Sequence, residues 1–513
     1  MSRGAWWAAA IVAVVVAFVH LVSAGRYGIF VNELYFIVCG RHPAFGYVDQ
    51  PPFVPLLAAL TQLGGVDLWL MRLPGILAAV ALVPLTVALA QLIGASTRGA
   101  WLAAVAYASA TLVTALSATL GTSTFEPLEF TAVAYFVTRA IVRNEPRSYW
   151  WAGLVGGLAF ETRYGILWWV AGLAIGVAVC GPRSIFRSRD LWIGIGIAAV
   201  IALPNAVWQA VHGFPFVELV RNDNSGNFIG SPLGFTLGQF FLINMVVALL
   251  CIVGVVAPFV MSRLAPFRFL AVAFVVALVL IYVTHGKAYY TAGVYPSIIA
   301  LGAAAVTNVP RALVGLWAVL AAANAALALP WVLPVLPVER FAAMLARSSF
   351  KPPAMERAGI GAPLMQVYST EFGWRELAQI VESVYASLPA SDRAKAAIYA
   401  PTYGDASAIN VYGRNLPFAI SGNNQYYLWG PGDHDGSVVI AVNADPRFWS
   451  GICASARVVG YTEDSPYAMP YEVHQPIVLC RGMHPPLPQL WPTFKHYGVE
   501  SPGVGAPKWF SGR

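Results

Sequence analysis

The chain has 513 residues, of which 58% are hydrophobic and 11% charged, and its mean hydropathy is +0.65. This composition excludes an ordinary soluble domain and indicates a protein that crosses a membrane several times. The net charge of +7 does not indicate a nucleic-acid partner. Most arginines fall in loops between apolar segments, where they set the orientation of the chain in the membrane.

The first apolar segment, residues 5–22, follows Arg3 and is long enough to cross a bilayer. A cleaved signal peptide is the alternative, but "LVSAGRYG" is a poor cleavage site, so a retained anchor is expected. Further spans are expected at 69–93, 101–118, 124–142, 149–161, 164–180, 191–211, 236–260, 268–284, 290–306 and 312–330. With the first segment they make about eleven transmembrane helices.

Between the first two spans, residues 24–68 are expected to form interfacial helices and an acidic loop. "ELYFIVCGRHPAF" has near-helical spacing and is too short to span, which predicts an amphipathic helix along the outer interface. "GYVDQPP" is typical of a turn that fixes the backbone around Asp49.

The composition changes after about residue 330. With a cytoplasmic N-terminus the inside loops carry most of the arginines, and an odd number of spans puts the rest of the chain outside. Residues 1–330 are therefore expected to form the transmembrane domain, and residues 331–513 an extracytoplasmic α/β domain. In the latter, "AAIYAP", "SVVIAVN" and "IVLC" predict strands, whereas "GDASAINVYG" and "PRFWSGICASA" predict helices.

Two of the five cysteines, Cys453 and Cys480, lie in the expected outer domain. The compartment there is oxidising, so we predict a structural disulfide between them; the alternative is two buried free thiols.

Polar side chains gather near the expected outer ends of the helices. They are Asn32, Glu33, Asp49, Glu126, Glu161, Arg163, Glu218, Arg221, His285 and Lys287. Lys287 is the only lysine in the first 330 residues. Any one of these groups could simply reach the interface or pair with a neighbour. Because they come from five separate outside loops, the set indicates a site that handles a phosphate and activates a hydroxyl.

The same residues resemble a known family. "NELY" followed by "GYVDQPP" is similar to a pattern of the GT-C lipid-dependent glycosyltransferases, in which an acidic pair precedes an aromatic residue and a "GYxDxPP" motif follows. This family includes protein O-mannosyltransferases and the aminoarabinose transferase of lipid A. The resemblance continues in "GTSTFEPLEF", "WWAGLVGGLAFETRYGIL", "LPNAVWQAVHGFPFVEL" and "HGKAYYTAGVYP". "GWRELAQIVESVY", "YGDASAINVYG" and "WPTFKHYG" resemble the outer domain of a bacterial subgroup.

The resemblance implies an enzyme of the bacterial plasma (inner) membrane that transfers a sugar from a polyprenyl-phosphate donor to an acceptor hydroxyl outside, with inversion. The acceptor would be a cell-envelope glycan, lipid or protein. Asp49 matches an acidic residue that can bind a divalent metal cation, Glu126 a second acidic position, and Lys287 a lysine near the lipid phosphate. We expect Arg163, Arg221 and Tyr290 to assist at the phosphate, and Glu218 and His285 to be further polar groups of the site.

One position departs from the family. Its expected catalytic aspartate is Asn32 here, followed by Glu33, and an amide cannot act as a base. Either Glu33 or Asp49 therefore takes this role, or Asn32 only orients the acceptor, or the protein is no longer a transferase. The family's metal-site histidine is also not evident; Glu218, Asn222 and Asp223 are the nearest candidates, which leaves a metal requirement open.

A different class fits the same phosphate-binding groups: a transporter or flippase for polyprenyl-phosphate sugars, or a noncatalytic binding scaffold. Transporters have broken helices and polar groups near the bilayer midplane. The middles of the expected spans carry almost no charge, which favours chemistry at one face of the membrane.

Overall fold

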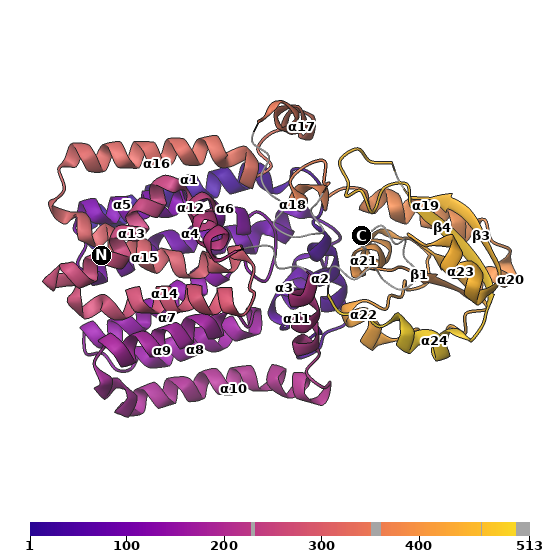
Figure 1. Cartoon of the computed structure of the whole chain (residues 1–513), viewed down its shortest axis with the longest axis horizontal. Coiled ribbons are helices and arrows are strands. Elements are labelled where there is room, and N and C mark those ends of the chain that lie inside the picture. The colour runs from indigo at the N-terminus through magenta and orange to yellow at the C-terminus, as the bar shows by residue number, and fades with distance from the viewer. Residues whose placement is uncertain (227–230, 350–360, 463, 499–513) are drawn as a thin grey trace. The chain divides into compact units, whose positions relative to one another are not determined.

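The computed structural model describes residues 1–226, 231–349, 361–462 and 464–498 (Figure 1). The chain folds into two compact units. Unit 1 comprises Met1–Arg26, Val66–Trp208 and Gly230–Leu336. Unit 2 comprises Tyr27–Gly65, Gln209–Ile229 and Pro337–Arg513.

The expected boundary near residue 330 lies close to the observed one at Leu336, but two inserted segments differ. Residues 24–68 are expected in the transmembrane domain, whereas Tyr27–Gly65 belongs to unit 2 with the C-terminal part of the chain, as does Gln209–Ile229. The physical reason is direct contact, since helix α2 (Val31–Arg41) packs on helix α21 (Tyr403–Tyr412).

Unit 1 is built of apolar helices of different lengths, and the longer ones run side by side (Figure 1). In chain order they are α1 (Arg3–Ala24), α4 (Leu68–Ile93), α5 (Thr97–Ala108), α6 (Thr111–Leu116), α7 (Glu126–Val142), α8 (Ser148–Thr162), α9 (Ile166–Cys180), α10 (Arg189–Val211), α12 (Pro232–Ile243), α13 (Met245–Val260), α14 (Arg268–Val283), α15 (Tyr295–Ala305) and α16 (Arg311–Val332). Their ends follow ordinary capping rules: the Asp67 side chain accepts from the Leu70 N–H at the start of α4, and Gly94 ends that helix with φ 105°.

Every expected span contains helix, and the chain is a multi-pass membrane protein, but the helices differ in length. Among the described residues, five helices are long and apolar enough to cross a membrane alone, or six if α12 and α13 count as one span bent by 113°. The others are shorter or interrupted; α5 ends at Ala108 and α6 begins at Thr111. Length and apolarity therefore support fewer independent spans than the eleven expected.

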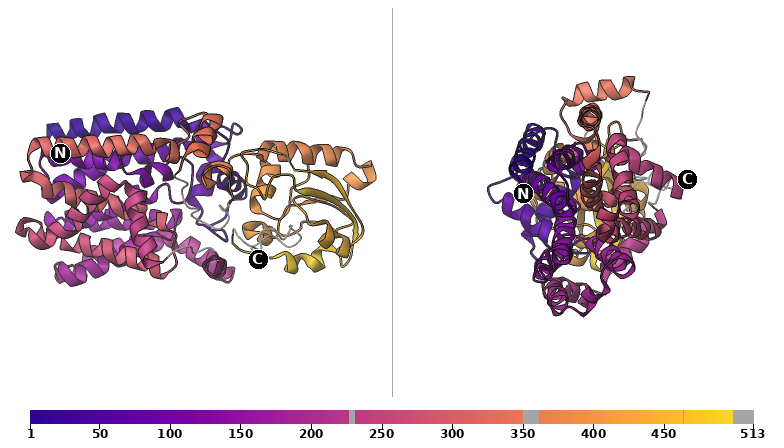
Figure 2. Two further views of the ribbon diagram at one scale, coloured as in Figure 1. Left: turned by 45° about the horizontal axis from the view of Figure 1, so that its top comes forward. Right: turned by 90° about the vertical axis from the view of Figure 1, so that its left-hand side faces the viewer.

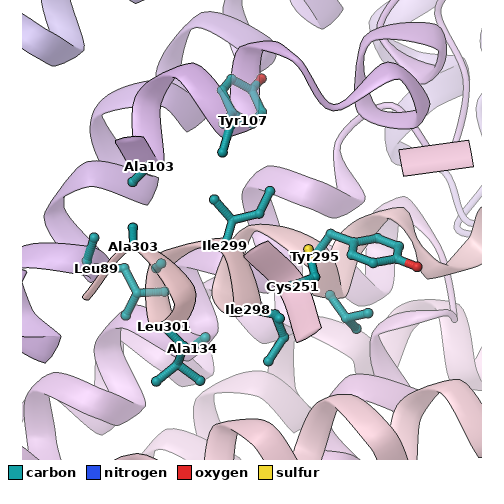
Figure 3. Packing of buried hydrophobic residues seen from close by; sticks show 14 of the residues in the cluster. Leu89, Ala103, Tyr107, Ala134, Cys251, Tyr295, Ile298, Ile299, Leu301 and Ala303 are labelled. Atoms are coloured by element: carbon teal, nitrogen blue, oxygen red, sulfur yellow. The ribbon is translucent and has the colours of Figure 1, made fainter. Parts of the chain in front are cut away.

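Helix α15 forms the centre of the unit 1 core, and all its residues are buried. Figure 3 shows Ile298, Ile299 and Leu301 of this helix among apolar side chains of neighbouring helices. Gly254 and Gly302 let α13 and α15 approach closely, because a Cβ at either glycine would overlap a backbone carbonyl of the other helix.

Unit 2 contains a four-stranded sheet with helices packed against it (Figure 2). The strands are β1 (Ala396–Tyr399), β2 (Val438–Ala441), β3 (Cys453–Tyr461) and β4 (Pro476–Met483), in the order β1-β2-β4-β3. β1 and β2 are parallel, and the other neighbours are antiparallel. Its helices include α2, α3 (Phe53–Thr61), α11 (Pro215–Gly226), α17 (Val338–Arg347), α18 (Gln366–Ser369), α19 (Trp374–Ala386), α20 (Ala390–Arg393), α21, α22 (Asn424–Trp429), α23 (Pro446–Ile452) and α24 (Leu487–Phe494).

Strands β1, β2 and β4 and helix α21 confirm the sequence predictions, whereas the helix predicted over "PRFWSGICASA" is wrong in its second half. Helix α23 stops at Ile452, and Cys453 begins strand β3. β3 lies at an edge of the sheet, so its residues are mostly exposed and small, and they lack the apolar alternation of a buried strand. The structure forms the predicted disulfide between Cys453 and Cys480, which joins β3 to β4.

The prediction for α2 is also wrong in one respect. The helix exists, but it is not amphipathic, because every residue from Glu33 to Gly40 is buried within unit 2. An apolar exposed face occurs instead around α3, where Leu56, Leu60 and Leu63 are 44%, 63% and 81% exposed.

Candidate functional site

The start of α2 holds Asn32 and Glu33. The Glu33 carboxylate accepts a hydrogen bond from the Phe30 N–H at 2.9 Å, which closes the first turn of the helix, and the residue is fully buried. The Asn32 side-chain oxygen accepts from the Tyr403 hydroxyl at 2.8 Å, and this bond joins α2 to α21. Both side chains thus take part in the structure of unit 2.

Asp49 lies in the turn between α2 and α3, and this turn is tightly held. The Tyr47 hydroxyl donates to the Cys39 carbonyl at 2.8 Å, and the Tyr47 N–H donates to the Gln50 carbonyl at 2.9 Å. The Val48 N–H donates to the Gln425 side chain at 3.1 Å. The predicted turn is therefore present, and its backbone fixes the position of the Asp49 carboxylate.

Two side chains of unit 2 bind this carboxylate. The Tyr35 hydroxyl donates to Asp49 Oδ1 at 2.9 Å, and Asn424 Nδ2 donates to Oδ2 at 3.4 Å. The Tyr35 hydroxyl also accepts from the Gln425 N–H at 3.1 Å, so α22 orients Tyr35 as well. Burial raises the pKa of Asp49 to about 7; the Tyr35 hydrogen bond lowers it and the negative charge of Asp223 raises it. A carboxylate with a pKa near the working pH suits general-base catalysis.

Helix α11 carries four of the predicted polar groups. The Glu218 carboxylate forms a half-exposed ion pair with Lys495 at 2.8 Å, and Arg221 is exposed. Asn222 Nδ2 donates to the Tyr497 carbonyl at 3.0 Å, and Asp223 is near enough to raise the pKa of Asp49. Glu218 is thus held by a lysine of the C-terminal segment, whereas the charge of Asp223 acts on Asp49.

A divalent cation has a limited set of ligands in unit 2. Within residues 1–226, 231–349, 361–462 and 464–498, no group of three or more His, Cys, Asp or Glu side chains could hold a metal ion. Asp49 and Asp223 are two carboxylates, which is the number that Mg²⁺ uses when substrate phosphates supply further ligands. Asp49 stays the predicted ligand of the cation that the resemblance implies, and the metal requirement stays a prediction.

Unit 1 contains a second polar cluster, centred on Arg163 at the end of α8. Its guanidinium pairs with Glu126 Oε2 at 3.2 Å, donates to the Ser123 hydroxyl, and lies 3.7 Å from the centre of the Tyr290 ring. The Arg163 side chain is 17% exposed and that of Glu126 is 1% exposed. A cation held between a carboxylate and an aromatic ring is well placed to bind a phosphate with its remaining N–H groups.

Gly165 completes this cluster. A Cβ on Gly165 would overlap Glu126 Oε1, so the absence of a side chain there makes room for the carboxylate. Lys287 directly precedes the short helix η3 (Ala288–Val294), which carries Tyr290, and is half-buried; His285 is exposed two residues earlier, with φ 56°. The sequence motif "HGKAYY" thus places Lys287 on the segment that also provides the ring against Arg163.

Two partners of Asp49, Tyr35 and Asn424, are not among the predicted site residues, nor is Gln425, whose N–H donates to the Tyr35 hydroxyl. Tyr35 is three positions after Asn32 in the opening motif, so helical spacing could have identified it. Asn424 and Gln425 are far from Asp49 in the sequence, and no local pattern indicates that contact.

Solved structures show what this fold is. The chain resembles ArnT from Cupriavidus metallidurans bound to undecaprenyl phosphate, with a TM-score of 0.61 and 13% identity over 93% of this chain and 98% of that one. ArnT of the same organism in the apo state gives a TM-score of 0.59 at the same identity and coverage. The chain therefore has the GT-C fold of these structures.

Two sequence comparisons agree with this class. A family model described as dolichyl-phosphate-mannose-protein mannosyltransferase matches residues 49–208, a stretch that begins at Asp49. The lipid A galacturonosyltransferase RgtD of Rhizobium johnstonii is 28% identical over 193 residues, which are 36% of this chain. The matched stretch spans 39% of the length of that relative.

Proposed function

We propose that the protein is a membrane glycosyltransferase that transfers a sugar from a polyprenyl-phosphate donor to an acceptor hydroxyl on the outer face of the membrane, with inversion. The observation that carries this proposal is Asp49, a carboxylate held by Tyr35 with a pKa of about 7. The GT-C fold and the binding of undecaprenyl phosphate by ArnT support the choice of donor.

Asp49 is the base in this reaction. As a carboxylate it takes the proton of the acceptor hydroxyl, whose oxygen forms a bond to the anomeric carbon of the sugar. The bond from that carbon to the phosphate oxygen breaks, and the electron pair leaves with the polyprenyl phosphate. The geometry favours Asp49 over Glu33, because the Glu33 carboxylate is fully buried and bonded to the first turn of its own helix.

Arg163 is the principal ligand of the donor phosphate. The leaving group is already a phosphate, so the reaction needs charge neutralisation at its oxygens rather than a strong acid. Glu126 and Tyr290 hold the guanidinium in place, and Lys287 supplies a second cation from the segment before Tyr290. A divalent cation, when bound, would add further neutralising charge at the phosphate. Arg221, Glu218 and His285 remain predicted auxiliary groups.

The lipid part of the donor has a place in unit 1. An apolar cavity of about 420 Å³ lies among α12, α13 and α14, lined by residues such as Phe235, Ile252, Phe274 and Leu278. Such a cavity suits a hydrocarbon chain and would hold few polar ligands. This supports a lipid-linked sugar rather than a soluble nucleotide sugar.

The proposed acceptor is a component of the cell envelope: a glycan, a lipid or a protein. RgtD is named for transfer to lipid A, which supports a saccharide or glycolipid. The proposed location is the bacterial plasma (inner) membrane, with the N-terminus in the cytoplasm and the C-terminal unit outside, as the arginine distribution predicts.

One observation favours the transporter alternative. Helices α12 and α13 meet at Asn244 with a bend of 113°, and broken helices are common in transporters. At this break, however, the Asn244 side chain accepts from the Val246 N–H and donates to the carbonyls of Ser109 and Ala321. These bonds give the break a structural explanation, so the transferase remains the stronger proposal.

The experiment uses purified protein in nanodiscs with a panel of polyprenyl-phosphate sugars and a cell-envelope extract as acceptor. Donor consumption is measured for the parent chain, for Asp49→Asn and for Glu33→Gln, with and without EDTA. We expect one donor to turn over and Asp49→Asn to lower turnover ~100-fold or more. If Glu33→Gln instead lowers turnover by this factor and Asp49→Asn leaves it unchanged, the base is Glu33. Binding of donor without turnover in the parent chain would favour the transporter or scaffold.

A further inference from the structure

A bond between a hydroxyl and a carboxyl group joins α7 to the end of α8 in unit 1. The two helices pack side by side (Figure 1), and Thr162 is the last residue of α8. Its hydroxyl donates to Glu129 Oε1 at 2.7 Å and lies 3.1 Å from the carbonyl of Leu158, one turn back in its own helix. Thr162 is 1% exposed, so water does not compete for this bond.

The residue that follows Thr162 is Arg163. Its N–H donates to the Ala159 carbonyl at 2.8 Å, but its own backbone is extended, so the helix ends there. The contacts of its guanidinium with Glu126, Ser123 and the Tyr290 ring act on the tip of a long side chain. The other end of that side chain starts from the end of α8. A shift of the backbone there would therefore move the guanidinium or break its pair with Glu126.

Two carboxyl groups of α7 hold these two consecutive residues of α8. Glu126 and Glu129 are three positions apart in the first turn of α7, which puts them on one face of the helix. Glu126 pairs with the Arg163 side chain at 3.2 Å, and Glu129 binds Thr162. Among the residues that the structure describes, Glu129 Oε2 has no hydrogen-bond partner, so the bond from Thr162 is the one that accounts for this carboxyl group.

We propose that Glu129 is a positioning residue for the donor phosphate. Its bond to Thr162 fixes the end of α8, and this places the guanidinium of Arg163 where the phosphate binds. A binding group has to be held within about 0.5 Å of its productive position by the groups behind it. The role needs an acceptor oxygen rather than a negative charge, because Thr162 donates a neutral hydroxyl. The inference rests on the proposed function, in which Arg163 is the principal ligand of that phosphate.

Phosphate affinity can be measured without turnover. The full chain in nanodiscs is titrated calorimetrically with farnesyl phosphate, a short polyprenyl phosphate that carries no sugar, and with farnesol, which lacks the phosphate. Thr162→Val removes the hydroxyl and keeps the shape of the side chain. We expect it to weaken binding of farnesyl phosphate about tenfold and to leave binding of farnesol unchanged. Glu129→Leu removes the acceptor, should have the same effect, and replaces Thr162→Val if that variant does not fold.

Conservative variants separate positioning from other roles. Thr162→Ser keeps the hydroxyl and Glu129→Gln keeps an acceptor oxygen, so both should bind farnesyl phosphate as the parent chain does. When Glu129→Leu and Thr162→Val are combined, the loss should equal that of either change alone, because both remove the same bond. The matched control is Thr131→Val. The buried Thr131 hydroxyl donates to the Pro127 carbonyl at 2.6 Å within α7, and its removal should leave both affinities unchanged.

Arg163→Gln distinguishes failure of this inference from failure of the proposed function. If Arg163→Gln loses affinity for farnesyl phosphate while Thr162→Val and Glu129→Leu keep it, the inference is wrong and the phosphate site stands. If Arg163→Gln keeps full affinity, both are contradicted. A loss in Thr162→Val that is the same for farnesyl phosphate and farnesol, or a tenfold loss in Glu129→Gln, would also overturn the inference.

Turnover gives a second measurement of the same role. Thr162→Val should raise the donor KM and leave kcat at saturating donor unchanged. A lowered kcat at an unchanged donor KM would assign Glu129 to the chemical step and overturn the inference. If no donor turns over but farnesyl phosphate binding follows the expected pattern, the protein holds the phosphate without transferring a sugar. That result contradicts the proposed function and supports the role of Glu129 in phosphate binding.

Discussion

Removing the Tyr35 hydroxyl should change how activity depends on pH. In Tyr35→Phe the hydrogen bond of 2.9 Å to Asp49 is lost, and this bond favours the charged carboxylate. A hydrogen bond to a charged group contributes ~1.5–3 kcal/mol, and one pKa unit corresponds to ~1.4 kcal/mol. The pKa of Asp49 should therefore rise from about 7 by roughly one to two units.

The carboxylate is the active form of a base, so activity rises as the pH passes through its pKa. In the parent chain the rising limb of kcat/KM should have its midpoint near pH 7. In Tyr35→Phe we expect it between roughly pH 8 and 9, with most of the lost activity recovered above that midpoint. The assay is initial-rate donor consumption in nanodiscs at a series of pH values.

The matched control is Tyr47→Phe. The Tyr47 hydroxyl donates to the Cys39 carbonyl at 2.8 Å in the same turn, and the bonds to Asp49 come from Tyr35 and Asn424. Its loss should affect stability more than the pH profile. If Tyr35→Phe, like the control, leaves the midpoint of the pH profile where it is in the parent chain, Asp49 does not set the pH dependence of activity. The reasoning about its role as the base is then wrong.

Two further predictions concern the rest of the molecule. Gly165→Ala places a methyl group on Glu126 Oε1, so the Glu126–Arg163 pair should break and the donor KM should rise about tenfold, as measured by donor titration. The control is Gly156→Ala, because a Cβ at Gly156 meets nothing within 4 Å. An unchanged donor KM would exclude Arg163 from phosphate binding. Replacing Cys453 and Cys480 together by serine should lower the stability of unit 2 by ~2–4 kcal/mol, measured by chemical denaturation, while activity at low denaturant is retained. Equal stability with and without the disulfide would show that β3 is held by its strand pairing alone.

The sequence predicts helices and strands correctly where the pattern lies within the element itself. Apolar length predicted a helix at each expected span, and short apolar runs predicted β1, β2 and β4. It failed where burial comes from distant parts of the chain. Helix α2 has an alternating pattern that suggests an interface, yet α21 and its neighbours cover it, which no local pattern indicates.

The candidate site divides in the same way. Asp49, Glu126, Arg163 and Lys287 can be predicted from charge in apolar surroundings, because a polar group there requires a reason. The contacts that give Asp49 its properties were not, because Asn424 lies 375 residues from it in the chain. The choice between Glu33 and Asp49 as the proposed base also depends on the structure. Both are carboxylates in one short stretch of sequence, and only their hydrogen bonds distinguish them.

The most direct test of the proposed reaction is donor turnover by Asp49→Asn. The exchange keeps the size of the side chain and removes the base, so the variant should insert into membranes, bind the polyprenyl-phosphate donor as the parent chain does, and lose turnover by ~100-fold or more. Turnover within a few-fold of the parent chain, with donor binding intact, would contradict the assignment of Asp49 as the base.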